Sequence, residues 1–307
     1  MILNILFIVI GIVLVLWGAD RLTDGAVAVA EKMKMPQIVI GLTIVAMGTS
    51  MPEFCVSLIS ALKGTSDLAV GNIVGSNIFN TLLIVGVSAL VAPMSIMKTT
   101  VRKDIPFALV ASALLLIMCL DGDISRIDAA ILFVMFLIFM YITLRGAKAQ
   151  GTDLEEKEKK PMATWLSVVW ILVGLACLIG GSNLFVDGAT VVATKLGVSE
   201  AVIGLTIVAG GTSLPELATS VVSARKGNSG IAIGNVLGSN VFNILAILGL
   251  TGVISPMTLK GITMTDLSMM VISIILIWLF SFTKYKIERW EGAILTAVFV
   301  GYIYSLL

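Results

Sequence analysis

The chain has 307 residues, of which 58% are hydrophobic and only 13% are charged, with a mean hydropathy of +1.07 and no histidine. This composition exceeds what a soluble core requires, and apolar runs near the ~20 residues that cross a bilayer recur about ten times. The net charge of +1 argues against a nucleic-acid partner, and no nucleotide loop, nucleophile–base set or cofactor motif indicates an enzyme. We therefore expect an all-α polytopic protein of the lipid bilayer.

Ten helical segments are predicted in chain order. They cover residues 2–30, 37–62, 69–91, 103–120, 125–146, 162–194, 200–225, 231–254, 264–282 and 289–306. The first has no basic region before it and no cleavage pattern after it, so a retained helix is favoured over a signal peptide. The polar stretch 147–161 is the one linker that we predict, and it is too short for a second soluble domain.

The chain repeats itself at an offset of 163 residues. Residues 39–53 and 202–216 agree at 13 of 15 positions, and the match continues without a gap from about residue 18 to residue 94. Each copy holds five predicted helices, which is an odd number, so the two copies enter the membrane from opposite sides. We predict a first five-helix repeat at 1–146, a cytoplasmic linker at 147–161 and a second, inverted repeat at 162–307.

The positive charges of the loops predict the orientation of the chain. With the N-terminus outside, the inward loops carry fifteen Lys and Arg residues and the outward loops carry four. Positive loops stay on the cytoplasmic side of a membrane protein. We therefore expect a multi-pass protein of the cell's inner (plasma) membrane with both termini on the outer side.

The most polar stretch within a predicted helix is Gly41–Glu53, GLTIVAMGTSMPE, which returns as Gly204–Glu216, GLTIVAGGTSLPE. Pro52 has no N–H for the preceding turn, so helices 2 and 7 are predicted to break at the centre of the membrane. Broken membrane helices are tolerated where their free carbonyls line a cavity or bind an ion. Because acids at bilayer depth are energetically costly, Glu53 and Glu216 are predicted to be functional.

Polar side chains recur at helical spacing around these acids and therefore share faces. Each copy has a Thr–Glu–Ser face followed by an Asn–Ser–Asn stripe on the next helix: Thr49, Glu53, Ser57, Asn72, Ser76 and Asn80, mirrored by Thr212, Glu216, Ser220, Asn235, Ser239 and Asn243. All the donors are oxygens, which suits Ca²⁺ or Na⁺ rather than zinc or copper. Two facing carboxylates without a cation are disfavoured, so obligatory exchange is expected. If Na⁺ is the counter-ion, two ions match the two glutamates and the hydroxyl and amide oxygens can hold a third, which would make the cycle electrogenic.

The paired GTSMPE and GTSLPE motifs, together with GSNIFN and GSNVFN, resemble those of the prokaryotic sodium/calcium exchangers of the calcium/cation antiporter superfamily. The resemblance covers nearly the whole chain. It implies a Ca²⁺/Na⁺ antiporter that works by alternating access, without a cofactor, with the first and sixth helices sliding over the core. It also implies a set of metal ligands: Glu53, Glu216, Ala46, Thr49, Ser50, Ala209, Thr212, Ser213, Ser76, Ser239, Asn80 and Asn243.

Two departures from the family pattern bear on function. Animal exchangers carry a large regulatory domain between their halves, where this chain has only residues 147–161, so calcium-sensing regulation of that kind is not expected. The potassium-dependent branch carries an acid where this chain has Asn243, which argues against potassium cotransport. A monomer is expected.

Two other functions stay open. On the same scaffold, Glu53 and Glu216 could carry protons in a H⁺/Ca²⁺ antiporter. A cation channel is the third hypothesis, which the inverted repeat and the single pair of acids disfavour.

Several polar residues outside the ligand set have two readings. A ligand role and a supporting role carry equal weight for four asparagines, Asn72, Asn77, Asn235 and Asn240. Asp24 is expected near the membrane interface, paired with Arg21. The second copy cannot repeat this pair, because Leu184 stands at the position equivalent to Arg21.

Overall fold

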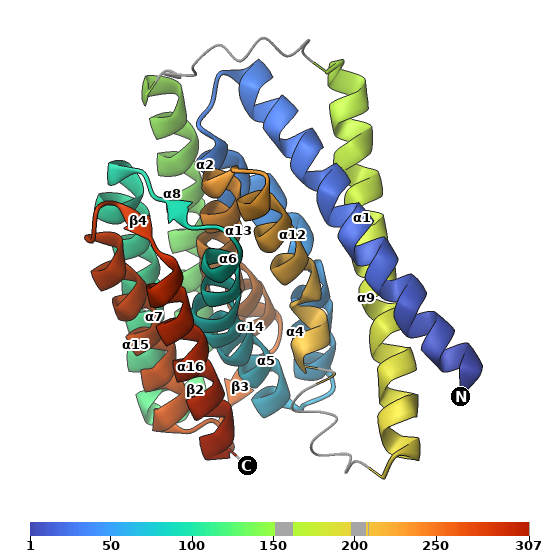
Figure 1. Ribbon diagram of the computed structural model, residues 1–307. Helices are drawn as coiled ribbons and strands as arrows, with labels where there is room; N and C mark the ends of the chain where they lie inside the picture. Colours follow the sequence, from blue (N-terminus) through green and yellow to red (C-terminus); the bar gives the residue numbers. More distant parts are fainter. Residues whose placement is uncertain (151–161, 198–206, 208, 307) are drawn as a thin grey trace.

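The computed structural model describes residues 1–150, 162–197, 207 and 209–306, and the protein is a bundle of long helices (Figure 1). Most of the predicted linker and the start of the predicted helix 200–225 therefore lie outside the described residues. Seven helices of the described part are long and apolar enough to cross a membrane, and a bent helix pair provides an eighth candidate span. The predicted helical, multi-pass character of the chain is confirmed.

The first half of the chain is helical except for two very short strands. Its elements are α1 (Ile2–Met33), α2 (Gln37–Ile40), η1 (Gly41–Val45), α3 (Ala46–Thr49), α4 (Met51–Leu62), α5 (Ser66–Ile78), η2 (Phe79–Ile84), α6 (Val85–Val91), β1 (Met94–Ser95), η3 (Thr100–Asp104), α7 (Ile105–Met118), η4 (Cys119–Asp121), β2 (Asp123–Ile124) and α8 (Arg126–Gln150).

The second half follows the same order. Its described elements are α9 (Thr164–Lys195), α11 (Ala209–Thr212), α12 (Leu214–Arg225), α13 (Ser229–Val241), η6 (Phe242–Leu248), α14 (Gly249–Ile254), β3 (Met257–Thr258), α15 (Met264–Ser281), β4 (Lys286–Ile287) and α16 (Arg289–Leu306). The end of α8 and the start of α9 lie at one face of the bundle, at the top of Figure 1, and we call this the linker face. Both chain termini lie toward the opposite face, the terminal face.

The core of the bundle is formed by the third helical segment of each half. The most apolar window of α13 to α14 is entirely buried, whereas only 22% of the corresponding window of α1 is buried. Two glycines allow the central backbones to touch: a Cβ added to Gly41 of η1 would lie 2.9 Å from the Cα of Gly234 in α13, and the converse holds. The second copy's GxxxG pair, Gly234 and Gly238, thus permits the close approach that its spacing predicts.

Helices α1 and α9 pack against each other along one edge of the bundle (Figure 1). Their contact is a seam of glycines spaced seven residues apart in each helix: Gly11, Gly18 and Gly25 in α1, and Gly174, Gly181 and Gly188 in α9. A Cβ on Gly18 would lie 2.7 Å from the carbonyl oxygen of Gly174. Small residues let membrane helices approach at backbone distance, and a seven-residue period keeps the same face in contact along a supercoil.

Two antiparallel strand pairs join the halves, which the prediction of an all-α fold did not include. Strand β1 pairs with β4, so that Met94 lies opposite Ile287. Strand β2 pairs with β3, so that Ile124 lies opposite Met257. The two pairs are equivalent under the 163-residue offset, since 94 + 163 = 257 and 124 + 163 = 287. Each half therefore lends one strand to each pair.

Candidate cation-binding site

Both predicted breaks carry a glutamate at the start of a new helix. The segments Gln37–Thr49 and Met51–Leu62 meet at an angle of 48°. The break lies at Ser50, two residues before Pro52, because proline fits the first turn of a helix and disrupts only the turn before it. Glu53 therefore lies in the first turn of α4, where free N–H groups favour a negative charge.

The second copy repeats this geometry. Ser213 has φ −91° and ψ 6°, close to the −83° and 11° of Ser50, and Glu216 lies in the first turn of α12. Helix N-termini that flank a broken membrane helix are typical of ion sites in transporters.

The two glutamates are each held by a serine of the opposite half. The Ser50 hydroxyl donates to Oε1 of Glu216 at 2.9 Å, and the Ser213 hydroxyl donates to Oε1 of Glu53 at 3.0 Å. Both carboxylates are 1% exposed. The structure thus brings the two predicted acids into one buried site. We call this site, formed by Glu53, Glu216, Ser50 and Ser213 with the polar side chains around them, the cage.

The second oxygen of each carboxylate, Oε2, is buried and has no hydrogen-bond partner in the described part of the chain. The same holds for three further buried oxygens: Oδ1 of Asn80, Oδ1 of Asn243 and Oγ of Ser239. Buried polar atoms in proteins almost always have a partner. No group of three or more His, Cys, Asp or Glu side chains that could hold a metal ion occurs among the described residues. The unpartnered acceptors are thus two carboxylate oxygens and neutral oxygens. Such a set fits a hard cation.

The remaining predicted ligands lie at or beside the cage. The Ser76 hydroxyl is 3.3 Å from that of Ser213. The Thr49 hydroxyl donates to the Ala46 carbonyl at 3.3 Å and also lies 3.1 Å from Oδ1 of Asn235. Thr212 is half-buried on α11, and the side chain of Ala209 lies outside the described residues.

Two asparagines that had two readings hold the helices on which the glutamates lie. Asn72 donates its side-chain amide to the carbonyl of Glu53 at 3.2 Å and to the Ser57 hydroxyl at 3.0 Å. Asn235 makes the same two contacts in the second half, to Glu216 at 3.2 Å and to Ser220 at 3.0 Å. The geometry favours the supporting role, because these amide groups donate to the protein.

The other two asparagines, Asn77 and Asn240, cross between the halves. Asn243 donates to Oδ1 of Asn77 at 3.1 Å, and Asn80 donates to Oδ1 of Asn240 at 3.1 Å. Asn77 donates in turn to the Asn240 carbonyl at 3.3 Å, and Asn240 donates to the Thr81 hydroxyl at 2.7 Å. Both residues are fully buried.

Asn80 and Asn243 lie on π-helical turns, which the sequence reasoning missed. Turns η2 and η6 begin at equivalent positions, since 79 + 163 = 242. A π turn inserts one extra residue and is frequent at functional sites. It rotates the following side chains away from the simple i, i+4 stripe on which the prediction relied.

Two cavities approach the cage from opposite faces. One of about 500 Å³ opens at the terminal face beside α16 and reaches Asn72 and Ser76. The other, of about 260 Å³, lies on the linker side and is lined by Ile38, Val39 and Leu42. The cavities are related by the repeat: residues 99, 103, 139 and 143 of the smaller correspond to 262, 266, 302 and 306 of the larger.

The smaller cavity stops short of the cage because α2 and η1 pack on α13. A Cβ on Gly238 would lie 2.6 Å from the Cα of Leu42 and 2.7 Å from the Cβ of Ala46. Among the described residues, no atom lies within 4 Å of such a Cβ on the equivalent Gly75, whose face of α5 lines the larger cavity. The repeat counterparts of Leu42 and of the Ala46 side chain lie outside the described residues. Within the described part of the chain, a cavity thus leads to the cage from the terminal face, whereas packing of α2 and η1 closes the cage toward the linker face.

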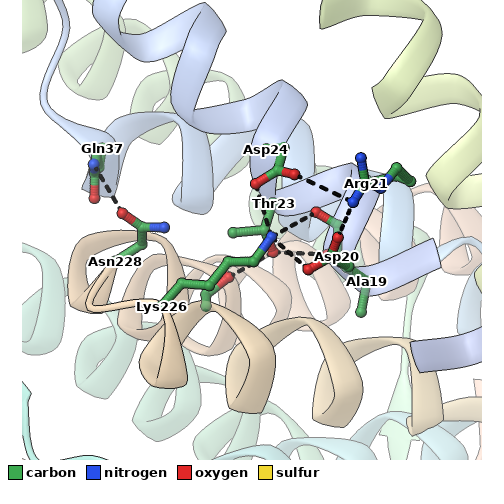
Figure 2. A network of polar contacts seen from close by, with 9 residues as sticks. Ala19, Asp20, Arg21, Thr23, Asp24, Gln37, Lys226 and Asn228 are labelled. Carbon is green, nitrogen blue, oxygen red and sulfur yellow. Dashed lines mark hydrogen bonds and ion pairs between the residues drawn. The ribbon is translucent and has the colours of Figure 1, made fainter. Parts of the chain in front are cut away.

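An ion-pair cluster ties α1 to the end of α12 on the closed side (Figure 2). The predicted pair of Arg21 and Asp24 is present at 3.7 Å, and Arg21 also contacts Asp20. The ammonium of Lys226, which the sequence reasoning did not connect with them, lies 2.5 Å from Asp20 and 2.7 Å from Asp24. Beneath the cluster, the Thr23 hydroxyl is 3.0 Å from that of Ser223.

Comparisons with known proteins agree with this architecture. The family model described as sodium/calcium exchanger protein matches residues 3–145 and 166–307. The chain belongs to the sodium/calcium exchanger family. This exchanger is 39% identical to CaxA of Alkalimonas amylolytica and 38% identical to inner membrane protein YrbG of Escherichia coli strain K12. Each alignment covers 100% of this chain, and 99% and 97% of the respective relative.

A solved structure of the sodium-calcium exchanger NCX_Mj superimposes on this exchanger with a TM-score of 0.88 at 32% identity, covering 100% of this chain and 99% of the other. The predicted family and the helical membrane fold are confirmed. The ligand roles of individual residues and the division of the chain into repeats stay predictions.

Proposed function

We propose that this exchanger moves Ca²⁺ across the membrane in exchange for Na⁺, with both cations bound in the cage between the halves. The observation that carries the proposal is the crossed pair of contacts, Ser50 to Glu216 and Ser213 to Glu53, which leaves one oxygen of each buried carboxylate without a hydrogen-bond partner in the described part of the chain. Neutral oxygens from Asn80, Asn243 and Ser239 extend the set. Ca²⁺ accepts irregular shells of six to eight oxygens, and Na⁺ is also a hard cation.

The charge of the cage supports exchange rather than free diffusion. One Ca²⁺ neutralises Glu53 and Glu216, as do two Na⁺ ions, and the neutral oxygens provide room for a third Na⁺. Two ionised carboxylates in a dry interior without a cation are costly. The protein without a bound cation therefore rarely passes between the states that open to the two sides of the membrane. With three Na⁺ per Ca²⁺ the cycle is electrogenic.

The pair of repeat-related cavities supports alternating access. The larger cavity reaches the cage from the terminal face, and its counterpart on the linker face is closed by α2 and η1. Because the two halves share a sequence plan, exchanging their conformations opens the linker face and closes the terminal face. The two states thereby expose one cage to two compartments in turn.

The arrangement in the membrane follows from the loop charges. We place both termini outside and residues 147–161 in the cytoplasm, so that the linker face is cytoplasmic. The division into repeats at 1–146 and 162–307, a monomeric state, a location in the inner membrane and function without a cofactor belong to the same proposal.

The test is Ca²⁺ uptake by purified protein in liposomes. An outward Na⁺ gradient is expected to drive uptake at fixed voltage, and a proton gradient is expected to drive none. Uptake driven by protons alone would replace the Na⁺ proposal with H⁺/Ca²⁺ exchange. Uptake with no counter-ion gradient would indicate a channel.

A further inference from the structure

The orientation of two side-chain amides decides whether the cage presents oxygen or nitrogen to a cation. A primary amide has nearly the same shape in both orientations, so only its hydrogen bonds fix which end faces the site. The NH₂ ends of Asn80 and Asn243 are both occupied at 3.1 Å by side-chain oxygens of the opposite half. Their Oδ1 atoms are the ends without a partner among the described residues.

The acceptors that hold these amides are fixed in their own orientation. Asn240 donates to the Thr81 hydroxyl at 2.7 Å, and that hydroxyl donates to the Asn77 carbonyl at 2.7 Å. Asn77 donates to the Asn240 carbonyl at 3.3 Å. Each acceptor oxygen therefore cannot become a donor without breaking a second buried hydrogen bond, which costs the protein the desolvation of that group.

We propose that Asn77 and Asn240 are positioning residues that keep the amide oxygens of Asn243 and Asn80, respectively, directed at the transported cation. This inference rests on the proposed function of the cage and adds to it a determinant of affinity outside the predicted ligand set. Each amide is oriented by the opposite half: Asn77 of α5 orients the amide of Asn243 on η6, and Asn240 of α13 orients the amide of Asn80 on η2. An inverted amide would direct an NH₂ group at the cation and repel it.

The test uses the symmetry of a carboxylate, which presents an oxygen in either orientation. We measure the Kd of Ca²⁺ from ligand-induced shifts in Tm of the full-length protein in detergent, along with the KM of Ca²⁺ exchange in liposomes. Asn240→Leu and Asn77→Leu each remove one acceptor at similar volume. Both are expected to raise the Kd and KM on the order of tenfold, since one ligand oxygen is lost.

Rescue is expected only in matched pairs. In the N80D background, Asn240→Leu should change the Kd by less than twofold, because no amide remains to be oriented, whereas Asn77→Leu should keep its full effect. In the N243D background the pattern should reverse. Additive effects in all four double variants would overturn the inference, since a merely structural role has no reason to follow the pairing.

The wild type tests the proposed function separately. If it binds Ca²⁺ but fails to exchange it for Na⁺, the proposed function is wrong, and the Kd values still test the positioning role. If it exchanges the ions and the pairing fails, only the inference is wrong. If Asn240→Leu fails to fold, the Asn77→Leu variants in the N80D and N243D backgrounds still test the pairing.

A second inference comes from the ion-pair cluster on the linker face (Figure 2). Under the 163-residue offset, Lys226 corresponds to Lys63 and Asp24 corresponds to Asp187. Lys63 and Asp187 are both exposed and form no ion pair within the described part of the chain. The cluster is thus formed on the side where the cage is closed, and its counterpart is open on the side where the cage is reached.

We propose that the two clusters are conformational latches that form in turn, with Lys63 and Asp187 pairing in the state that opens to the linker face. Lys226 bridges α1 to the end of α12 in the present state, so breaking it removes contacts that only this state makes. A ligand or contact shifts an equilibrium by its difference between the two states. The partly exposed side chains limit the effect to on the order of threefold.

The test compares apparent Ca²⁺ affinity at each face in right-side-out and inside-out vesicles. Lys226→Ala is expected to raise the affinity at the linker face and lower it at the terminal face, about threefold each, and Lys63→Ala should do the reverse. The double variant N183D/L184R supplies the second half with the counterparts of Asp20, which would pair with Lys63, and of Arg21, which would pair with the two acids. It should act like Lys226→Ala. Shifts of the same sign at both faces, or no effect of the rebuilt cluster, would overturn this inference.

Discussion

Gly41 and Gly234 meet backbone to backbone at the centre of the protein: a Cβ on either would lie 2.9 Å from the Cα of the other. The two residues belong to different halves, and their contact closes the path from the cage to the linker face. The lack of side chains at these two positions therefore allows the helices that carry the cage to pack at backbone distance. Substitutions along this contact report directly on which face is closed.

The first prediction concerns Gly238 and its equivalent Gly75. Gly238→Ala would place a Cβ 2.6 Å from the backbone of Leu42, so we expect a loss of about 1–3 kcal/mol in stability. Gly75→Ala meets no atom of the described residues within 4 Å and adds helix propensity, so its Tm should be unchanged or slightly higher. Thermal unfolding of both purified variants measures the difference, and equal Tm values would contradict the assigned closed face.

The second prediction concerns the acids. Glu53→Gln and Glu216→Gln each remove one negative charge from the cage and leave the shape of the side chain, so Ca²⁺ exchange should be abolished while expression and Tm change little. The control Glu31→Gln changes an exposed acid at the end of α1 and should leave exchange intact. Full transport by either cage variant in liposomes would end the ligand assignment.

The third prediction concerns the crossed serines. Ser50→Ala and Ser213→Ala each remove a hydroxyl that donates to a buried carboxylate, an interaction worth about 1.5–3 kcal/mol. The KM for Ca²⁺ should rise by on the order of tenfold or more. Ser112→Ala removes a buried hydroxyl that has no partner in the described part of the chain, so exchange should be unaffected. Equal KM values for all three variants would refute the role of the crossed contacts.

The fourth prediction concerns the seam between α1 and α9. Gly18→Ala would bring a Cβ within 2.7 Å of the Gly174 carbonyl oxygen, which can move only if the helices separate. We expect a loss of about 1–3 kcal/mol in stability, read as a lower Tm. Gly180→Ala, at an exposed glycine next to the seam residue Gly181 with no atom of the described residues within 4 Å, is the matched control. A stable Gly18→Ala variant would show that the two helices are not held by this seam.

Much of the site could be predicted because the chain contains it twice. One GTSMPE motif is a polar anomaly, but two copies with acids in register imply a shared centre, and the structure brings Glu53 and Glu216 together there. The spacing of Asn80 was less informative. A π turn is invisible to a 3.6-residue period, and the orientation of an amide depends on partners that are 160 or more residues away.

Other features were present in the sequence but unused. The glycines at 11, 18 and 25 recur at 174, 181 and 188, so the seam is written in the same repeat as the acids. Lys226 could not be assigned to Asp24, because 202 residues separate them and no local pattern connects their helices. The short strands follow no hydrophobic alternation, since two residues are too few to show one.

The strand pairs determine which parts can move relative to which. Met94 with Ile287 and Ile124 with Met257 join the two halves by backbone hydrogen bonds at opposite faces of the bundle. Because both strand pairs join the two halves, we do not expect the halves to tilt against each other as two rigid bodies. We therefore expect the α1–α9 pair to move relative to the elements that surround the cage, rather than one half relative to the other. The two sequence repeats are thus not expected to coincide with the parts of the protein that move as rigid bodies.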